Sequence, residues 1–464
     1  MTFRLTRRSA IGAGLTIIVG PALAACGGAS VPTPPAKAAT APTATAPSAL
    51  PTAAPSPTML PPTPTAAPPP PTARPTDTPR PRDGSMTSPD HSVHVFLWGG
   101  FETTKRDLNL VRELGFSWVK QRFEWRYVEP HVKGKTEWNE PDRIVDAVST
   151  AGLKLIARID NQPRWTRSDP AWPIDGPPDK LSDFGDFLRA MAERYRERIH
   201  AYQIWNEPNL AREWGNKPPN PAQYVEMLKV AHAAIKAADP AATVISAGLS
   251  PTTASGAIAM PDVEFATKMY QAGAKPYFDL LGVHAAGFKA PPEMSPEDIA
   301  KDPKLNHGEG AAGRVYGFRH AEDLRAVMAA NGDAAKRVAV LEFGWTSDDR
   351  PNSPYRWHAV TEEEKAQYLT RAFDYAAKNW RPWIGPMTVI YIADPAWTRD
   401  HEQYHWSITG PDGSPRPAFT ALAKMTKAGA VTPLTLPAGA TPIVTAKPAS
   451  RSASLTPTRA PAKR

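Results

Sequence analysis

Residues 338–345 read VAVLEFGW, an apolar run that closes on the glutamate Glu342. A second stretch, residues 202–209, reads YQIWNEPN and leads in the same way to Glu207. Continuous apolar runs are typical of strands that are buried on both faces, as in parallel sheets. A carboxylate that closes such a strand is costly to bury unless it is hydrogen-bonded or has a chemical role. These stretches therefore predict a parallel sheet with acidic groups at the ends of its strands.

Similar strand-like runs recur along the chain and alternate with amphipathic stretches. In residues 180–199, apolar side chains recur every three or four positions, which is the period of a helix. Eight strand–helix units fit a (β/α)8 TIM barrel. The alternative, a doubly wound open sheet, lacks support because no glycine-rich turn follows the first strand. The expected strands are Val93–Trp98, Ser117–Arg122, Leu153–Asp160, Ala201–Trp205, Thr243–Ala247, Phe278–His284, Val338–Glu342 and Met387–Ala393, and the expected helices include Asp142–Thr150, Lys180–Ile199, Pro221–Ala238 and Glu362–Asn379.

Polar side chains stand at the predicted strand ends, where TIM barrels carry their catalytic residues. Two of them, Glu207 and Glu342, are carboxylates on different strands, the kind of pair that acid–base and nucleophilic chemistry requires. The alternative is that each glutamate only begins a helix, where the helix dipole favours negative charge. A helix start explains one such glutamate well, but it explains less well why two different strands both end in a glutamate.

The motifs WNEPN (205–209) and EFGW (342–345) resemble the retaining glycoside hydrolases of clan A. Members of that clan have a (β/α)8 barrel with glutamates at the ends of strands four and seven. Within the clan the chain is most similar to family 39, the β-xylosidase/α-iduronidase family, with the cellulase-like family 5 next. The resemblance covers roughly Val93 to Leu422.

By this resemblance Glu207 is the general acid/base and Glu342 is the nucleophile, and opposed environments are expected to raise the pKa of one and lower that of the other. Asn206 is expected to hydrogen-bond the 2-hydroxyl of the sugar. Arg122 is expected to orient the nucleophile and keep it ionised. His284 matches a histidine that the clan often has at the end of strand six. The structural alternatives are a turn residue, an ion pair within the barrel and a buried histidine, respectively.

Aromatic side chains near the strand ends are candidates for stacking on pyranose rings. The clan commonly has a tyrosine close after the strand-six histidine, but here residues 285–287 read AAG. We expect Tyr391 or a loop tyrosine to take its place. Tryptophan also packs in protein cores, so about half of the tryptophan candidates are expected to be structural. The candidate platforms are Trp98, Trp125, Trp165, Trp345 and Trp397.

The N-terminus has the pattern of an export signal. Arg4, Arg7 and Arg8 precede the apolar run Ala10–Leu23, which is too short for a permanent membrane span. The one cysteine of the chain, Cys26, follows Leu-Ala-Ala. This arrangement resembles the bacterial lipobox, in which the cysteine is lipidated and becomes the mature N-terminus. The alternative is an ordinary signal peptide.

Proline-rich segments flank the expected barrel. Residues 31–89 contain 19 prolines among alanine and threonine, with hardly any apolar side chains, which predicts an extended linker. We therefore expect a lipoprotein signal peptide (1–25), a Pro/Ala/Thr-rich linker (26–89), a glycoside hydrolase domain (90–430) and a disordered Pro/Thr/Ala tail (431–464).

Charge and motif content argue against several other classes of protein. The chain has a net charge of +8, but the flanks carry +10, which leaves −2 on the predicted domain. A nucleic-acid-binding domain would carry its basic charge on the fold itself. The chain contains no His-Glu-x-x-His metal motif and no Gly-x-Ser-x-Gly nucleophile elbow. We expect neither a metal nor a cofactor.

The sequence thus predicts a monomeric, surface-anchored glycosidase that cleaves oligo- or polysaccharides and is exported as a bacterial lipoprotein. One alternative is a non-catalytic carbohydrate-binding or wall-spanning lipoprotein on the same scaffold. Another is a barrel hydrolase of non-sugar substrates. The paired glutamates together with Asn206 favour the glycosidase, because binding alone does not need two carboxylates.

Overall fold

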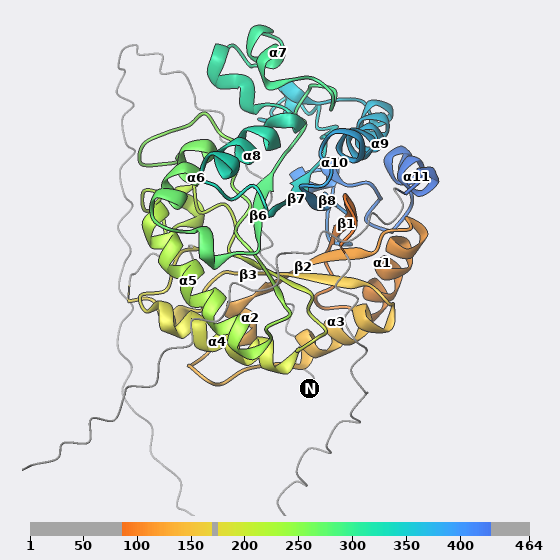
Figure 1. Ribbon diagram of the computed structural model, residues 1–464. Helices are drawn as coiled ribbons and strands as arrows, with labels where there is room; N and C mark the ends of the chain where they lie inside the picture. The colour runs from red at the N-terminus through yellow and green to blue at the C-terminus, as the bar shows by residue number, and fades with distance from the viewer. Residues whose placement is uncertain (1–85, 169–174, 428–464) are drawn as a thin grey trace, which may run out of the picture. The chain divides into compact units, whose positions relative to one another are not determined.

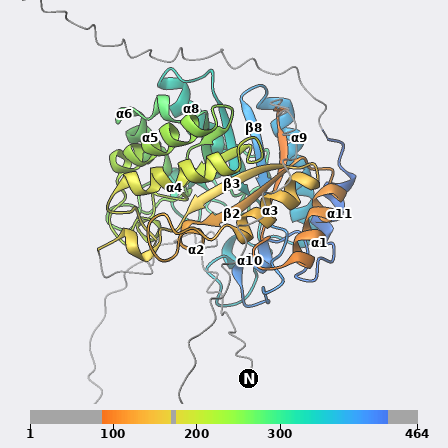
Figure 2. The same ribbon diagram turned by 90° about the horizontal axis from the view of Figure 1, so that it is seen from below.

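Eight parallel strands close into a barrel in the computed structural model, which describes residues 86–168 and 175–427. Closure is direct, since β1 pairs in parallel with both β2 and β8. The helices surround the strands (Figure 1), and the view from below shows the same outer ring (Figure 2). The expected (β/α)8 fold is confirmed.

The strands follow one another around the barrel in chain order. They are β1 Asp90–Val95, β2 Trp118–Glu124, β3 Lys154–Asp160, β4 Ala201–Ile204, β5 Thr243–Ile245, β6 Leu280–His284, β7 Arg337–Phe343 and β8 Ile384–Val389. The α-helices are α1 Phe101–Glu113, α2 Trp125–Val128, α3 Asn139–Thr150, α4 Leu181–Arg194, α5 Pro221–Ala238, α6 Asp262–Gln271, α7 Pro296–Lys301, α8 Ala321–Ala330, α9 Glu362–Asn379, α10 Glu402–Trp406 and α11 Pro417–Lys424. Short 3₁₀ turns include η2 Ala211–Glu213 and η4 Gly310–Val315.

The first and last strands begin earlier than the sequence predicts. The predicted strand Met387–Ala393 overlaps only the second half of β8, because Gly385 and Pro386 are poor strand formers and conceal its start. The apolar residues 390–393 follow the strand and are buried in the loop beyond it. In contrast, α5 and α9 have the predicted bounds.

Capping explains why α5 and α9 begin where they do. Asn220 directly precedes α5, and its side chain accepts a hydrogen bond from the backbone N–H of Gln223. Pro221 occupies the first turn of the helix. Thr361 and Glu364 form a reciprocal capping box at the start of α9. Each cap satisfies backbone N–H groups that have no partner within the helix.

The interior of the barrel is apolar at one end and polar at the other. Its apolar layer is built from Trp118, Ile156, Ala201, Ile245, Leu280, Ala339 and Leu341. Because side chains alternate along a strand, residues two positions further on also point inward. On β2, β3 and β4 these are Lys120, Arg158 and Gln203, and all three are buried. The fold thus places charged side chains in the C-terminal half of the barrel.

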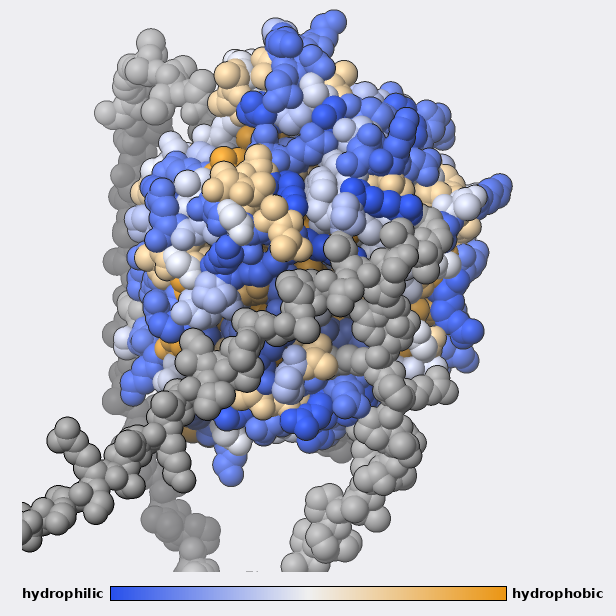
Figure 3. Space-filling view, in the orientation of Figure 1, coloured by the Kyte–Doolittle hydropathy of each residue, from blue (hydrophilic) through white to orange (hydrophobic). Residues whose placement is uncertain are grey.

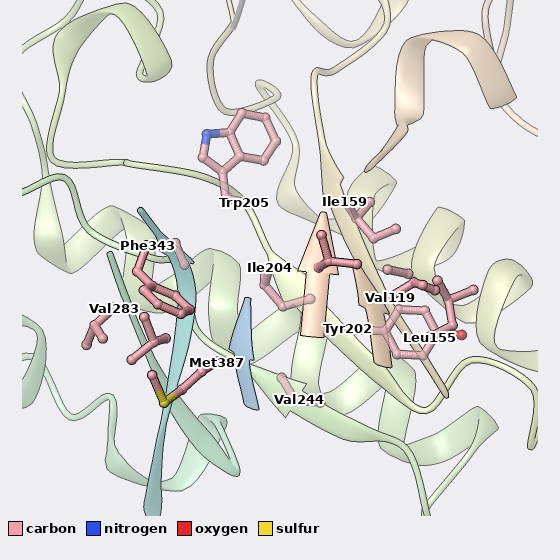
Figure 4. Close-up of a cluster of buried hydrophobic side chains, with 14 of the residues drawn as sticks. Val119, Leu155, Ile159, Tyr202, Ile204, Trp205, Val244, Val283, Phe343 and Met387 are labelled. Atoms are coloured by element: carbon pink, nitrogen blue, oxygen red, sulfur yellow. The ribbon is translucent and has the colours of Figure 1, made fainter. Parts of the chain in front are cut away.

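The outward-pointing strand residues form a second core with the helices. Val119, Leu155 and Ile204 come from three neighbouring strands and belong to one buried apolar cluster (Figure 4). Burying this surface is the main favourable term in the stability of such a domain.

Residues 86–89, which the sequence predicts to be part of the linker, contact the barrel. Nη1 of Arg337 lies 3.1 Å from the backbone oxygen of Met86 and 3.2 Å from that of Thr87. Arg381 donates to the backbone oxygen of Ser88. These contacts fix the chain just before β1.

The surface visible in Figure 3 is mostly hydrophilic, with scattered apolar patches. Phe101, Tyr127, Val132 and Ile258 are exposed large apolar side chains. Among residues 86–168 and 175–427, no helix combines the length and the apolar character needed to cross a bilayer.

Candidate active site

Two buried glutamates lie at the C-terminal end of the barrel and contact the same imidazole ring. Glu342 lies at the end of β7, and Glu207 follows β4. Nδ1 of His284, the last residue of β6, lies 3.0 Å from Oε1 of Glu207. Nε2 of the same ring lies 4.0 Å from Oε1 of Glu342. The structure therefore brings together the three side chains that the resemblance singled out on strands four, six and seven.

The backbone before Glu207 is held in an uncommon conformation. Trp205 and Glu207 have positive φ angles of 70° and 40°, in a region that non-glycine residues seldom adopt. The turn is held by hydrogen bonds from the Glu207 N–H to the Gly248 oxygen (3.0 Å) and from the Trp205 indole to the Glu213 oxygen (2.9 Å). Strained backbone of this kind persists only where its surroundings fix it, and it concentrates at functional sites.

Gly248 lies directly against the shared imidazole. A Cβ atom at this position would lie 2.2 Å from both Cδ2 and Nε2 of His284. The same residue accepts the hydrogen bond from Glu207. Gly248, which follows β5, therefore allows the end of β6 to approach closely. This close approach fixes the position of His284.

Glu342 is surrounded by nitrogen groups. Nζ of Lys120, on β2, lies 2.9 Å from Oε1 of Glu342 and also donates to the backbone oxygen of Leu341 at 2.9 Å. Nη1 of Arg158, on β3, lies 3.4 Å from the same carboxylate oxygen, and Nδ1 of His94, on β1, lies 3.9 Å from it. Together with His284 of β6, these residues direct basic side chains from four strands at one carboxylate.

This surrounding charge determines the ionisation of Glu342. Burial raises the pKa of the carboxyl group, but Lys120, His284 and Arg158 outweigh the effect of burial. The pKa of Glu342 therefore lies well below its ordinary value, and the group is ionised at neutral pH. Burial lowers the pKa of Lys120 to about 8, so its ammonium group is largely charged at pH 7.

Glu207 has a different partner, Arg212 of η2. Nη2 of Arg212 lies 2.8 Å from Oε2 of Glu207. Burial raises the pKa of Glu207, but the hydrogen bond to His284 and the charge of Arg212 outweigh it, so this pKa is lowered as well. The expectation that one glutamate has a raised and the other a lowered pKa is therefore wrong for this structure, because each carboxylate has a basic partner.

Arg122 does not contact Glu342, contrary to the expectation from sequence. Its Nε donates to Oδ1 of Asp160 at 2.8 Å, and its Nη1 lies 3.3 Å from Glu124. Arg122 lies one inward-facing position beyond Lys120, and Lys120 is the residue that reaches Glu342. Of the two readings considered for Arg122, the ion pair within the barrel is the observed one.

The candidate aromatic platforms fall into two groups. Trp125 and Trp345 are fully buried, so neither offers a face to a sugar. The indole of Trp125 packs on Phe184 and Phe187, and that of Trp345 donates to the backbone of Ala290. Both belong to the core because their side chains lie between the barrel and the outer elements. The expectation that these two stack on sugar rings is wrong.

Of the other aromatic candidates, Tyr391 and Trp397 are also nearly buried. Tyr391 packs edge-on to His94 with ring centroids 5.4 Å apart, and Trp397 contacts Tyr391 at the same distance. Trp98, which is partly exposed, lies 6.1 Å from the ring of Tyr127. Trp165 is also partly exposed, and its indole donates to the backbone of Glu129.

Asn206 is almost completely buried beside Glu207. Its Oδ1 lies 3.4 Å from Nε2 of Gln203, the inward-facing residue of β4. This contact orients the amide at the strand end.

Sequence reasoning missed several charged residues around the pair. They are His94, Lys120, Arg158, Arg212 and Glu402. For Lys120 and Arg158 a signal exists, since each is a basic residue inside an apolar strand and lies two positions before another charged residue of the same strand. For Arg212 and Glu402 no comparable signal exists, because both lie on short loop elements whose course the strand pattern does not determine.

The described residues, 86–168 and 175–427, contain no group of three His, Cys, Asp or Glu side chains that could hold a metal ion. Cys26 lies outside these residues.

Comparison with known proteins bears on this site. Residues 81–272 match the family model of cellulase, glycosyl hydrolase family 5. No protein of curated function matches the chain. Similar solved structures include a family 39 glycoside hydrolase from Bacteroides cellulosilyticus WH2 (TM-score 0.52, 20% identity, 74% of this chain and 64% of that one). A glucosidase from Croceicoccus marinus (0.52, 14%, 74% and 67%) and a GH5_18 variant from Streptomyces cattleya in complex with Manb1-4GlcNAc (0.54, 16%, 75% and 83%) are also similar.

These similarities confirm the expected resemblance to the clan A glycoside hydrolases. At identities of 20% or less, the solved structures show the fold, and the chain spans less than two thirds of the length of the family 39 relative. The family model, which matches residues 81–272, indicates similarity to the same class of enzyme. The chain has a TIM-barrel fold, and part of it is similar to the family 5 cellulases.

Proposed function

We propose that the protein is a glycoside hydrolase that cleaves O-glycosidic bonds of an oligo- or polysaccharide with retention of configuration. Glu342 attacks the anomeric carbon, and Glu207 protonates the departing oxygen and later activates water. The observation that carries the proposal is the contact of both glutamates with the single imidazole of His284. Retaining enzymes need their two carboxyl groups close together, and one ring in contact with both favours a short separation.

The charges around Glu342 support its role as nucleophile. A nucleophilic carboxylate must be ionised, and Lys120 and Arg158 stabilise the ionised form in a water-poor environment. His284 lies between the two carboxylates, which suits it to orient both. Asn206 follows β4 immediately before Glu207, where it can donate a hydrogen bond to the 2-hydroxyl of the bound sugar.

The stereochemistry of the product tests the mechanism. Proton NMR of the first-formed sugar, on a substrate found with a glycan panel, should show the anomer of the substrate because two displacements invert the centre twice. Glu342→Ala should lose several orders of magnitude of turnover. Glu207→Ala should keep more activity on glycosides with good leaving groups, and azide should restore its turnover by attacking the intermediate. An inverted product, or normal turnover by Glu342→Ala, contradicts the proposal, and glycan binding without any cleavage supports the non-catalytic alternative.

We also propose that the protein acts as a monomer, anchored to the outer face of a bacterial membrane through a lipid on Cys26. The support is the sequence alone: the charged N-terminal region, the short apolar run and Leu-Ala-Ala directly before the cysteine. The Pro/Ala/Thr-rich linker would separate the domain from the membrane surface.

A further inference from the structure

Arg212 is the basic residue that contacts the candidate acid/base. Its Nη2 lies 2.8 Å from Glu207, and its Nε lies 3.6 Å from Glu213. The arginine side chain is 27% exposed, whereas that of Glu207 is 2% exposed. A solvent-accessible cation therefore pairs with a buried carboxylate at the end of β4.

The local chain course explains this pairing. The Leu210 N–H donates to the Glu207 oxygen at 2.9 Å, which closes a tight turn after Glu207. The Ala211 N–H donates to the Ile258 oxygen at 2.9 Å and holds the start of η2. These two bonds bring Arg212, five residues after Glu207, back over its carboxylate.

Several charged or titratable groups face Glu207 from the elements packed around it. His284 comes from β6 and Glu342 from β7, and Glu213 and Glu402 come from η2 and α10. Burial raises the pKa of Glu213 to about 7 and that of Glu402 to about 8. Both are thus mainly protonated in mildly acidic solution, where they add little negative charge to offset Arg212.

A carboxylate held by a guanidinium cannot also donate a proton to a leaving group. The ion pair favours the ionised form of Glu207, which suits its second task as a base and opposes its first task as an acid. Arg212 therefore lowers the pKa of Glu207, so Glu207 loses its proton, and with it its acid function, at a lower pH.

We propose that Arg212 is a positioning residue that sets the upper pH limit of the reaction through its ion pair with Glu207. This inference rests on the proposed role of Glu207 as acid/base. The guanidinium touches Glu207 and acts on the reaction through it.

The test compares pH profiles of kcat/KM for the full chain and for Arg212→Gln and Arg212→Lys. The substrate is an aryl glycoside with a poor leaving group, of the sugar that a glycan panel identifies. Because an opposite charge at this range shifts a carboxyl pKa by about one unit or more, the basic limb of Arg212→Gln should move up by about one pH unit. Arg212→Lys keeps the charge and should keep the limb near its original position.

Two controls separate this effect from a general loss of charge or fold. Arg314→Gln removes a partly exposed arginine that binds Asp323 and Glu297, and should leave the limb unmoved. In a Glu207→Ala background, measured on an activated aryl glycoside, adding Arg212→Gln should cause no shift, because the group that Arg212 acts on is gone.

An unmoved basic limb in Arg212→Gln overturns the inference, and so does an equal shift that persists without Glu207. If azide still restores turnover to Glu207→Ala in that case, the acid/base assignment stands and only the role of Arg212 falls. If azide restores nothing, the proposed function itself fails.

Discussion

Replacing Lys120 by methionine removes the ammonium group that lies 2.9 Å from Glu342 and keeps a side chain of similar length. At an effective dielectric constant of about 20, such a pair interacts by about 6 kcal/mol. Relief of the lysine desolvation offsets part of this, and breaking a buried pair costs about 3–5 kcal/mol in practice. At about 1.36 kcal/mol per pKa unit, the pKa of Glu342 should rise by roughly 2–4 units.

The shift should appear in the acidic limb of the pH profile of kcat/KM. This limb reports protonation of the nucleophile, so in Lys120→Met it should move upward by roughly 2–4 pH units, with activity regained at higher pH. An activated aryl glycoside is the suitable substrate, because its cleavage needs little help from Glu207.

Arg122→Met is the matched control for this experiment. It removes a basic side chain one inward-facing position along the same strand, but one that is bonded to Asp160. This variant should lose activity or stability without moving the acidic limb. If Arg122→Met moves the limb and Lys120→Met does not, the assignment of Lys120 as the partner of the nucleophile is refuted.

The remaining predictions concern the rest of the chain. Burial raises the pKa of Glu402 from 4.5 to about 8 in the folded protein, so the folded state loses stability as the pH rises between these values and the buried group becomes charged. Glu402→Gln cannot become charged and should therefore raise the melting temperature more at pH 8 than at pH 4. Trp345→Ala should cost about 3–5 kcal/mol in urea unfolding, since the indole is fully buried; near-normal stability would contradict its place in the core. A chain that begins at Asp90 should melt below one that begins at residue 81, because it lacks the contacts of Met86–Pro89 with the barrel. Cys26→Ala should abolish labelling by fatty acid and release the protein from the membrane fraction, and unchanged retention would argue against the lipid anchor.

The fold could be predicted because strands four and seven carry an apolar run that ends in a carboxylate. Alternation of strands and helices then leaves few topologies, and the closed barrel is one of them. Strand boundaries were harder to predict where glycine and proline begin a strand, as in β8, or where an apolar loop continues it.

Only the principal residues of the site, Glu207, His284 and Glu342, could be predicted from the sequence. Lys120 and Arg122 have the same parity on β2, so both point inward, and periodicity cannot tell which one reaches across to Glu342. That choice depends on the stagger of the strands around the barrel. The same limit explains the wrong expectation for Trp125 and Trp345. The sequence does not show whether a tryptophan that follows a strand points toward the site or packs against the outer elements.

Gly248 gives a way to read distant relatives from their sequences. The space beside His284 admits no further carbon atom, so any side chain at the equivalent position displaces the ring that both glutamates share. The barrel core is built elsewhere, and its apolar layers do not depend on this residue. A homologue that keeps the apolar strands but replaces this glycine is therefore expected to keep the barrel fold and to lack this arrangement of His284 and the two glutamates.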